Sequence, residues 1–115
     1  MVRHQRWCGD RSKITALFEN EIAFQDADTI GAFIMEPVLG AGGVIVPHEN
    51  FMPLVRGICY RHGILMIADE VITAFGRTGA WSGSRLWNVK PDMMGLAKAI
   101  TNAYYLFGAL MIHKK

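Results

Sequence analysis

The feature that most constrains the fold is an alternation of two hydrophobic periods in the middle of the chain. Residues 30–35 and 64–68 are short continuous apolar runs, which are typical of strands buried on both faces of a sheet. Between them, the apolar residues of segment 51–59 recur at helical spacing, with Asn50 as a candidate cap and Gly63 as the stop. Strand, helix and strand in this order predict a crossover between parallel strands, and therefore an α/β fold.

The flanking segments extend this pattern. Residues 12–24 carry apolar side chains at helical spacing and predict an amphipathic helix with Ser12 as its cap. One helical turn is expected at 84–87, and two further short strands are expected at 93–97 and 108–112. The sequence therefore predicts four strands with helices beside them.

Composition limits the function classes. The chain has 115 residues, a length that suits one small domain. Because 51% of the residues are apolar and a small domain buries only part of its surface, some apolar faces are expected to be covered by other protein segments. Its formal charge of +2 comes from basic residues that are scattered except near the ends, so no nucleic-acid surface is expected. Cys8 and Cys59 have no partner at metal-ligand spacing, so neither a metal site nor a disulfide framework is expected.

No membrane or export signal is expected either. The longest apolar region, residues 30–46, is interrupted by Glu36, Pro37 and four glycines, so it does not predict a membrane span. The basic start, residues 1–11, has no apolar core behind it and does not predict a secretory signal. Together with the two cysteines, which indicate no disulfide framework, this makes a reducing, cytoplasmic location the default expectation.

Three charged residues follow three of the predicted strands. Glu36, Asp69 and Lys98 each fall at a carboxyl end, where sheets of this kind bind ligands. Charged residues are also common there simply because the chain enters water. A strand that ends in Asp69 and Glu70 also suits magnesium binding in phosphate-loop nucleotidases, but that hypothesis requires an upstream G-x-x-x-x-G-K-[ST] loop, which the sequence lacks.

Four segments carry a family resemblance. They are I-G-A-F-I-M-E-P-V at 30–38, G-A-G-G-V-I-V-P at 40–47, A-D-E-V-I-T-A-F-G-R-T-G at 68–79 and K-P-D-M-M-G-L-A-K at 90–98. In this order and spacing they resemble the class III, or omega, aminotransferases, which use pyridoxal 5'-phosphate on the type I aminotransferase fold. The resemblance implies that the strands belong to the mostly parallel, helix-flanked sheet of that fold's large domain.

The resemblance assigns cofactor roles to four residues. It places Asp69 at the ring nitrogen of the cofactor, where a carboxylate favours the protonated ring and strengthens it as an electron sink. It makes Lys98 the residue that binds the aldehyde and then transfers protons as general base and acid. Val71 would pack on the ring face, and Ile72 stands where many relatives carry a glutamine that reaches the ring hydroxyl. Ordinary core packing is the alternative for Val71 and Ile72.

Other positions are less directly interpretable. Glu36 is expected to line the site or to be structural, and Arg77 is expected to tie down the loop after the acid strand. The sequence departs from the family at Ala99, where relatives usually have glycine, and at Leu106, where they commonly have proline. Either change could disturb the turn beside the cofactor.

The resemblance covers the middle of the family's large domain. Residues 1–115 are interpreted as a partial cofactor-binding domain, with residues 1–13 weakly matched and the phosphate-anchoring segment and small C-terminal domain absent. The implied function is transfer of an amino group between an amine or omega-amino acid and a keto acid such as pyruvate, in a homodimer. An aminomutase or racemase on the same fold remains an alternative, and so does a truncated, non-catalytic fragment. The isolated chain is expected to be inactive.

Overall fold

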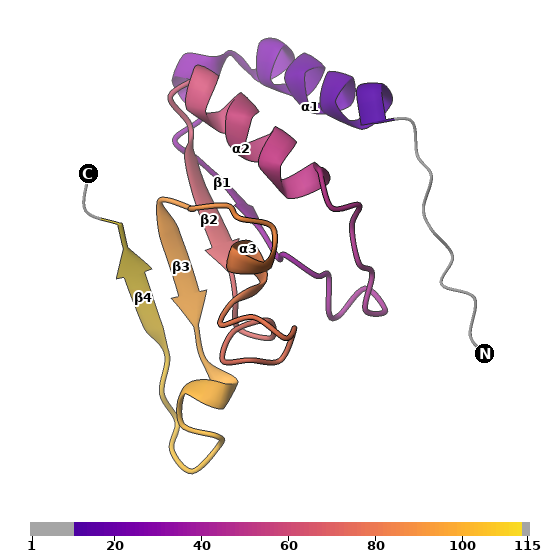
Figure 1. The fold of residues 1–115 in the computed structure, drawn as a ribbon. Helices are drawn as coiled ribbons and strands as arrows, with labels where there is room; N and C mark the ends of the chain where they lie inside the picture. Colours follow the sequence, from indigo (N-terminus) through magenta and orange to yellow (C-terminus); the bar gives the residue numbers. More distant parts are fainter. Residues whose placement is uncertain (1–10, 114–115) are drawn as a thin grey trace, which may run out of the picture.

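The sheet has four strands in the order β1-β2-β3-β4 (Figure 1). The structure, a computed structural model, describes residues 11–113. The strands are β1 (Ala32–Met35), β2 (Leu65–Asp69), β3 (Met93–Leu96) and β4 (Ala109–Ile112). The first three are parallel, and β4 is antiparallel to β3. The predicted α/β class, with a mostly parallel sheet and helices beside it, is confirmed.

The described residues also form three α-helices and two 3-10 helices, of which the first α-helix and the first 3-10 helix precede β1 and the other three lie between strands. The α-helices are α1 (Arg11–Gln25), α2 (Phe51–Arg61) and α3 (Gly83–Leu86). The short 3-10 helices, η1 (Ala27–Thr29) and η2 (Lys98–Ile100), were not predicted. Helix α2 packs against β2, and α1 packs against α2 (Figure 1). Within residues 11–113, no helix combines the length and hydrophobicity needed to cross a membrane.

Gly63 stops helix α2, as the sequence predicted, and the helix end forms a Schellman motif. Gly63 has a φ of 67°, in the left-handed region that glycine adopts without strain. The Ile64 N–H donates to the Cys59 carbonyl at 2.9 Å, and the Gly63 N–H donates to the Tyr60 carbonyl at 3.4 Å. At the other end Asn50 occupies the cap position, but its side chain makes no capping hydrogen bond. The helix leads directly into β2.

Helix α1 was predicted correctly, but two details of it were wrong. Ser12, expected as its cap, lies inside the helix. Leu17, expected on the apolar face, is 68% exposed. The helix is anchored by Ile22, which is buried, and by Phe18, whose ring lies 4.6 Å from the Phe33 ring of β1. Only part of its predicted apolar face therefore meets the sheet.

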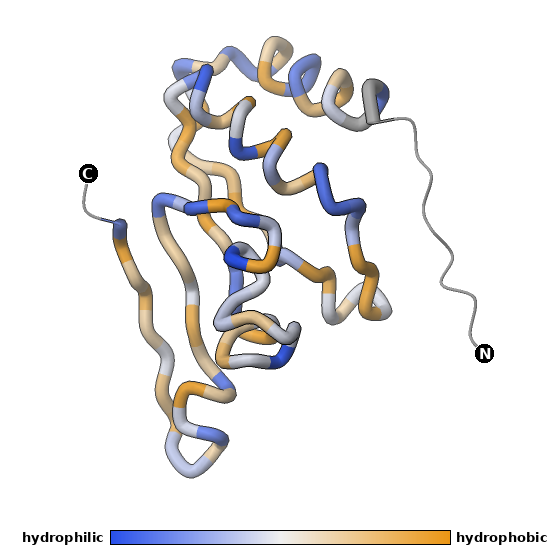
Figure 2. Tube along the Cα trace, viewed as in Figure 1, coloured by the Kyte–Doolittle hydropathy of each residue, from blue (hydrophilic) through white to orange (hydrophobic). Residues whose placement is uncertain are grey.

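The hydrophobic core lies between the two long helices and the sheet. Figure 2 shows mostly apolar segments along the strands, whereas the helices and loops alternate between apolar and polar segments. The buried cluster draws on α1, on α2 and on alternate residues of β2. Its members are Ile22, Met52, Val55, Ile58, Cys59, Ile64, Met66, Ala68 and Val89.

The prediction that the first strand is buried on both faces was wrong. Exposure alternates along β1, and Ile34 is 62% exposed while Phe33 packs against the core. A continuous apolar run indicates that both faces of a strand are apolar, but it does not identify which part of the protein covers each face. Among the described residues, α1 and α2 cover the face that carries Phe33, and Ile34 is left uncovered.

Candidate functional site

The three charged residues predicted at strand ends do lie at one edge of the sheet. Glu36 directly follows β1, Asp69 is the last residue of β2, and Lys98 follows β3 after one intervening residue. Asp69 pairs with Gly95 across the parallel β2–β3 ladder. Lys98 comes three residues after Gly95, a chain length of at most about 11 Å. The acid and the lysine therefore occupy the same end of adjacent strands.

Asp69 is half-buried and held by its own turn. Its Oδ1 accepts the Val71 N–H at 3.1 Å, which is the geometry of an Asx turn. Its Oδ2 has no hydrogen-bond partner among the described residues. The turn fixes the orientation of the carboxylate and leaves one oxygen available for a donor from outside the chain.

A groove of about 520 Å³ opens beside this carboxylate. Glu36 and Asp69 are its two charged residues, and the other lining residues are apolar: Ile34, Met35, Leu39, Ile45, Pro47 and Phe51. Lys98, Val71 and Ile72 are not part of this lining. The groove thus brings two of the predicted residues together and leaves the other three outside.

Lys98 begins η2 with an unusual backbone. Its φ is 47°, in the left-handed region, which a residue with a Cβ enters only at an energetic cost. The Ile100 N–H donates to the Ala97 carbonyl at 3.2 Å and so closes the turn around the lysine. The Lys98 side chain is exposed and forms no ion pair with any described residue. It is therefore accessible to a ligand at this edge.

Val71 and Ile72 are both half-buried in the turn after Asp69. A Cβ placed on Gly40 would collide with Ile72 Cδ1, so the isoleucine packs directly on the glycine-rich turn that follows β1. Glu36 Oε2 accepts the Gly40 N–H at 2.9 Å and holds that turn. Ile72 thus has a packing role in this structure, and its predicted contact with a cofactor stays a prediction.

Glu70 is a buried residue whose role the sequence analysis missed. Its side chain is fully buried, and its two oxygens accept the Gly83 N–H at 2.8 Å and the Ser84 N–H at 2.7 Å. Oε2 also accepts the Thr73 hydroxyl. These donors occupy the carboxylate, so Glu70 holds the loop after β2 and is not available as a magnesium ligand.

The loop after β2 is held by packing as well. A Cβ on Gly83 would lie 2.6 Å from Pro37 Cβ and 3.1 Å from Thr73 Cβ, so the loop approaches the end of β1 closely. Arg77, which was expected to tie this loop down, is exposed and makes no hydrogen bond or ion pair with the described residues. That expectation was wrong, because the loop is held by hydrogen bonds to the buried Glu70 and by the close packing of Gly83.

Comparison with known proteins identifies the family. Residues 7–115 match the model of the family described as aminotransferase class-III. The chain is 49% identical over 94 residues to the probable gamma-aminobutyrate transaminase 4 of Oryza sativa subsp. japonica, covering 82% of this chain and 20% of that protein. It is 44% identical over 101 residues to the mitochondrial gamma aminobutyrate transaminase 1 of Solanum lycopersicum, covering 88% and 20%. The chain thus spans about a fifth of the length of these relatives.

Solved structures give the same result. An amine transaminase from an uncultivated Pseudomonas species, in its PLP-bound form, matches 97% of this chain and 26% of its own with a TM-score of 0.87 and 49% identity. An (S)-enantioselective omega-transaminase from Thermomicrobium roseum matches 90% of this chain and 23% of its own with a TM-score of 0.88 and 40% identity. With its α/β sheet, its strand-end residues and these matches, the chain belongs to the class III aminotransferase family.

Proposed function

We propose that this chain supplies the ring-nitrogen acid and the cofactor-binding lysine of a pyridoxal 5'-phosphate-dependent aminotransferase. The observation that carries the proposal is the pairing of Asp69 with Gly95, because it puts Asp69 and the Lys98 turn at the same end of neighbouring strands. A planar cofactor that must be held at its ring nitrogen and at its aldehyde requires an acid and an amine at such a spacing.

The residues present fit this cofactor. Asp69 has one carboxylate oxygen without a partner among the described residues, as an acceptor for a protonated ring nitrogen requires. Val71 follows it in the same turn and offers an apolar surface, and Lys98 offers an exposed primary amine. When bound, pyridoxal phosphate supplies an electron sink for the negative charge that develops at the substrate carbon.

The chain's own residues then have distinct tasks. Asp69 holds a proton on the ring nitrogen, because a nearby carboxylate favours the charged form of that nitrogen. The Asx turn to Val71 keeps the carboxylate in place while the proton is held. Lys98 would hold the cofactor at its aldehyde through Nζ, and as a free amine the same Nζ would move a proton to and from the substrate carbon.

We propose that the substrates are an amine or omega-amino acid as donor and a keto acid such as pyruvate as acceptor. The support is that the matched relatives bear the names of gamma-aminobutyrate transaminases and amine transaminases. Ile72 is also apolar at the position where many relatives are expected to carry glutamine, and an apolar residue there is expected to be more typical of the omega-amino acid:pyruvate branch of the family. Assembly as a homodimer is part of the same proposal.

The left-handed backbone of Lys98 supports a functional role. A non-glycine residue held in this region is strained, and such strain persists where function requires the side chain. Glycine at the same position would remove the strain but would also remove the amine. Six other described non-glycine residues also have a positive φ, so the strain supports a functional role for Lys98 through its combination with the position of the lysine near Asp69.

The first test measures cofactor attachment, since the chain spans about a fifth of the matched relatives. The purified chain is incubated with pyridoxal phosphate, reduced with borohydride and digested for peptide mapping. The pyridoxyl group is expected on Lys98, with far less on Lys90, and Asp69→Asn is expected to weaken this preference. Equal labelling of the exposed lysines would overturn the proposal.

The second test is made in a full-length class III enzyme that carries this segment. Lys98→Ala is expected to abolish transfer from alanine, and Asp69→Asn is expected to lower kcat by orders of magnitude, because an amide does not keep the ring nitrogen protonated. Isomerisation of the substrate without a keto-acid product would instead favour an aminomutase or racemase. Unchanged turnover of Asp69→Asn would contradict the assigned role.

A further inference from the structure

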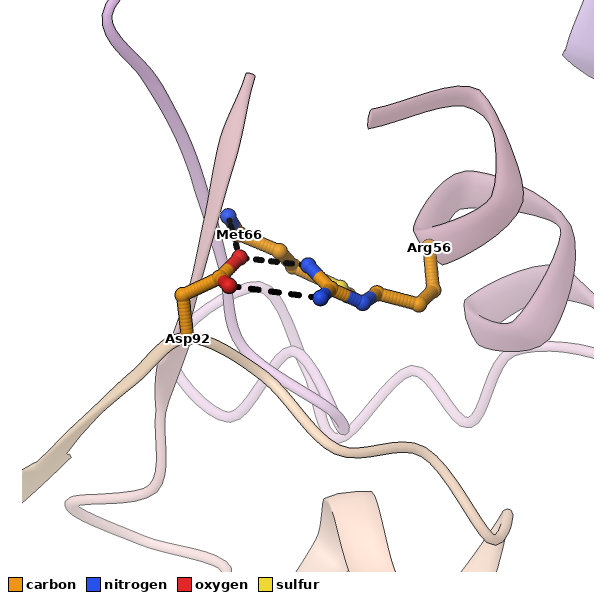
Figure 3. Close-up of polar contacts among 3 residues, drawn as sticks. All are labelled: Arg56, Met66 and Asp92. Carbon is orange, nitrogen blue, oxygen red and sulfur yellow. Dashed lines mark hydrogen bonds and ion pairs between the residues drawn. The ribbon is translucent and has the colours of Figure 1, made fainter. Parts of the chain in front are cut away.

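Asp92 joins four elements of the fold, and Figure 3 shows its contacts with Arg56 and Met66. It directly precedes β3, and its carboxylate forms a two-pronged pair with the guanidinium of Arg56 on α2, with Nη2 to Oδ1 at 3.2 Å and Nη1 on Oδ2. Oδ2 also accepts the Met66 N–H of β2 at 2.8 Å. The Asp92 carbonyl accepts the N–H of His113, just beyond β4, at 2.8 Å. One residue thus contacts α2, β2 and the end of β4 at the start of β3.

The main chain of Asp92 adds a second bond to the same residue of β2. Its N–H donates to the Met66 carbonyl at 2.8 Å, while its carboxylate accepts the Met66 N–H. Both polar groups of the Met66 backbone are therefore bound by a single residue. This two-point contact is possible at only one alignment of β2 and β3.

The rest of the β2–β3 ladder specifies its alignment weakly. It has three residue pairs, Ile67 with Met93, Ala68 with Met94 and Asp69 with Gly95. The two methionines are flexible and half-buried and Gly95 has no side chain, so these three positions specify the alignment weakly. At the far end of β3, the buried Leu96 and the bond from the Glu70 N–H to the Gly95 carbonyl at 2.9 Å favour the same alignment. The alignment therefore needs a determinant outside these three pairs.

We propose that Asp92 is a positioning residue that sets the β2–β3 register and, through it, the place of Lys98 relative to Asp69. The consequence for Lys98 rests on the proposed function; the register itself does not. A shift of one residue would move Lys98 along the sheet by about 3.3 Å and turn the side chains of β3 to the opposite face. It would also pair Asp69 with a different residue and break both bonds to Met66.

Arg56 orients the Asp92 carboxylate for its contact with Met66. A guanidinium that meets a carboxylate through two nitrogens fixes its plane, which a single ammonium contact does not do. The pair is largely shielded from water, with the side chains of Arg56 and Asp92 26% and 13% exposed. The second ion pair of α2, between Arg61 and Glu19, joins two helices at the surface and does not touch the sheet.

The test compares three forms of the full 115-residue chain by NMR: the parent, Asp92→Asn and the control Glu19→Gln. Asparagine has one acceptor oxygen, so its amide must present a donor either to Arg56 or to the Met66 N–H. Nuclear Overhauser contacts between β2 and β3 are expected to match the native pairs in the parent and control. In Asp92→Asn a second set, with the pairs shifted, is expected. A single native set in Asp92→Asn would overturn the proposal.

A second variant covers the case in which Asp92→Asn does not fold. Asp92→Glu keeps the charge for Arg56, but its extra methylene displaces the carboxylate from the Met66 N–H. A shifted or doubled set of β2–β3 contacts is expected for this variant too, with unchanged contacts between α1 and α2. Native pairing throughout would overturn the proposal.

The link to the lysine is measured separately. Pyridoxal phosphate labelling of Lys98 relative to Lys90 is expected to fall at least several-fold in whichever variant shifts its register, and to stay at the parent value in Glu19→Gln. A loss of fold would instead make all lysines react alike. If the parent itself shows no preference for Lys98, the proposed function fails, and the NMR contacts still decide whether Asp92 sets the register.

Discussion

The Glu70 carboxylate accepts the Ser84 backbone N–H at 2.7 Å inside the core, and this bond ties the end of β2 to the start of α3. Gly83 and Thr73 donate to the same carboxylate. Glu70 is thus the internal anchor of the loop that carries Val71 and Ile72. Because Glu70 directly follows Asp69 in the chain, it also restrains the backbone beside the candidate site.

Glu70→Gln is expected to lower the free energy of unfolding by about 1–3 kcal/mol. The glutamine amide would turn its NH2 toward one of these donors and leave a buried N–H or hydroxyl without an acceptor. Urea denaturation followed by circular dichroism measures the change. Glu49→Gln is the matched control, because Glu49 is exposed, and its effect is expected to stay within about 0.5 kcal/mol. Equal stability of the two variants would contradict the role of Glu70.

Gly83→Ala is expected to destabilise the protein by about 1–3 kcal/mol through overpacking. The new Cβ would lie 2.6 Å from Pro37 Cβ and 3.1 Å from Thr73 Cβ, and a Cβ is fixed to its backbone and cannot rotate away. Gly31→Ala is the control, because a Cβ there meets nothing within 4 Å. Thermal unfolding of the two variants compares them directly. A Gly83→Ala variant that unfolds at the same temperature as Gly31→Ala would show that the loop can retreat from β1.

Local features of the fold were readable from the sequence because they depend on neighbours along the chain. The end of α2 at Gly63 is one example, since the Schellman motif is made by consecutive residues and requires a left-handed position. The strand-end positions of Asp69 and Lys98 are another, since an apolar run ends where the chain leaves the core. For features of this kind, the residues that determine the local structure all lie within the same short segment of sequence.

Features that depend on distant partners were not readable in the same way. The exposure of Ile34 depends on what covers the outer face of β1, and the pair of Arg56 with Asp92 joins residues 36 positions apart. The burial of Glu70 could have been predicted from the sequence, because Met66, Ala68 and Glu70 alternate on one buried face of the strand. The adjacent acids Asp69 and Glu70 face opposite sides of the strand, and Glu70 is the one that is buried.

Cys59 provides a prediction about alkaline pH. Burial raises the pKa of its thiol, while the nearby Arg56 guanidinium lowers it and the Asp92 carboxylate raises it. The unfolded thiol therefore loses its proton at a lower pH than the folded one. The folded state then binds more protons, so stability falls as the pH rises above about 8.5.

The measurement uses a Cys8→Ser background, so that Cys59 is the only thiol. The loss of unfolding free energy between about pH 8 and about pH 10 is expected to be larger in this background than after a further Cys59→Ala change. Alkylation of Cys59 is also expected to be slow in the folded chain and fast in urea. Identical pH profiles with and without the thiol would contradict the prediction.

The strained backbone of Lys98 predicts an unusual ranking of substitutions. At a φ of 47°, a residue with a Cβ costs about 1–2 kcal/mol, whereas glycine adopts this conformation freely. Lys98→Gly is therefore expected to be more stable than Lys98→Ala by about 1 kcal/mol. At Lys90, which is exposed and lies outside the left-handed region, the order is expected to reverse, because glycine there only adds freedom to the unfolded chain. Urea titration of the four variants gives both differences under one set of conditions. If alanine is the more stable replacement at both positions, Lys98 is not strained, and the argument that its side chain is retained for function loses its physical basis.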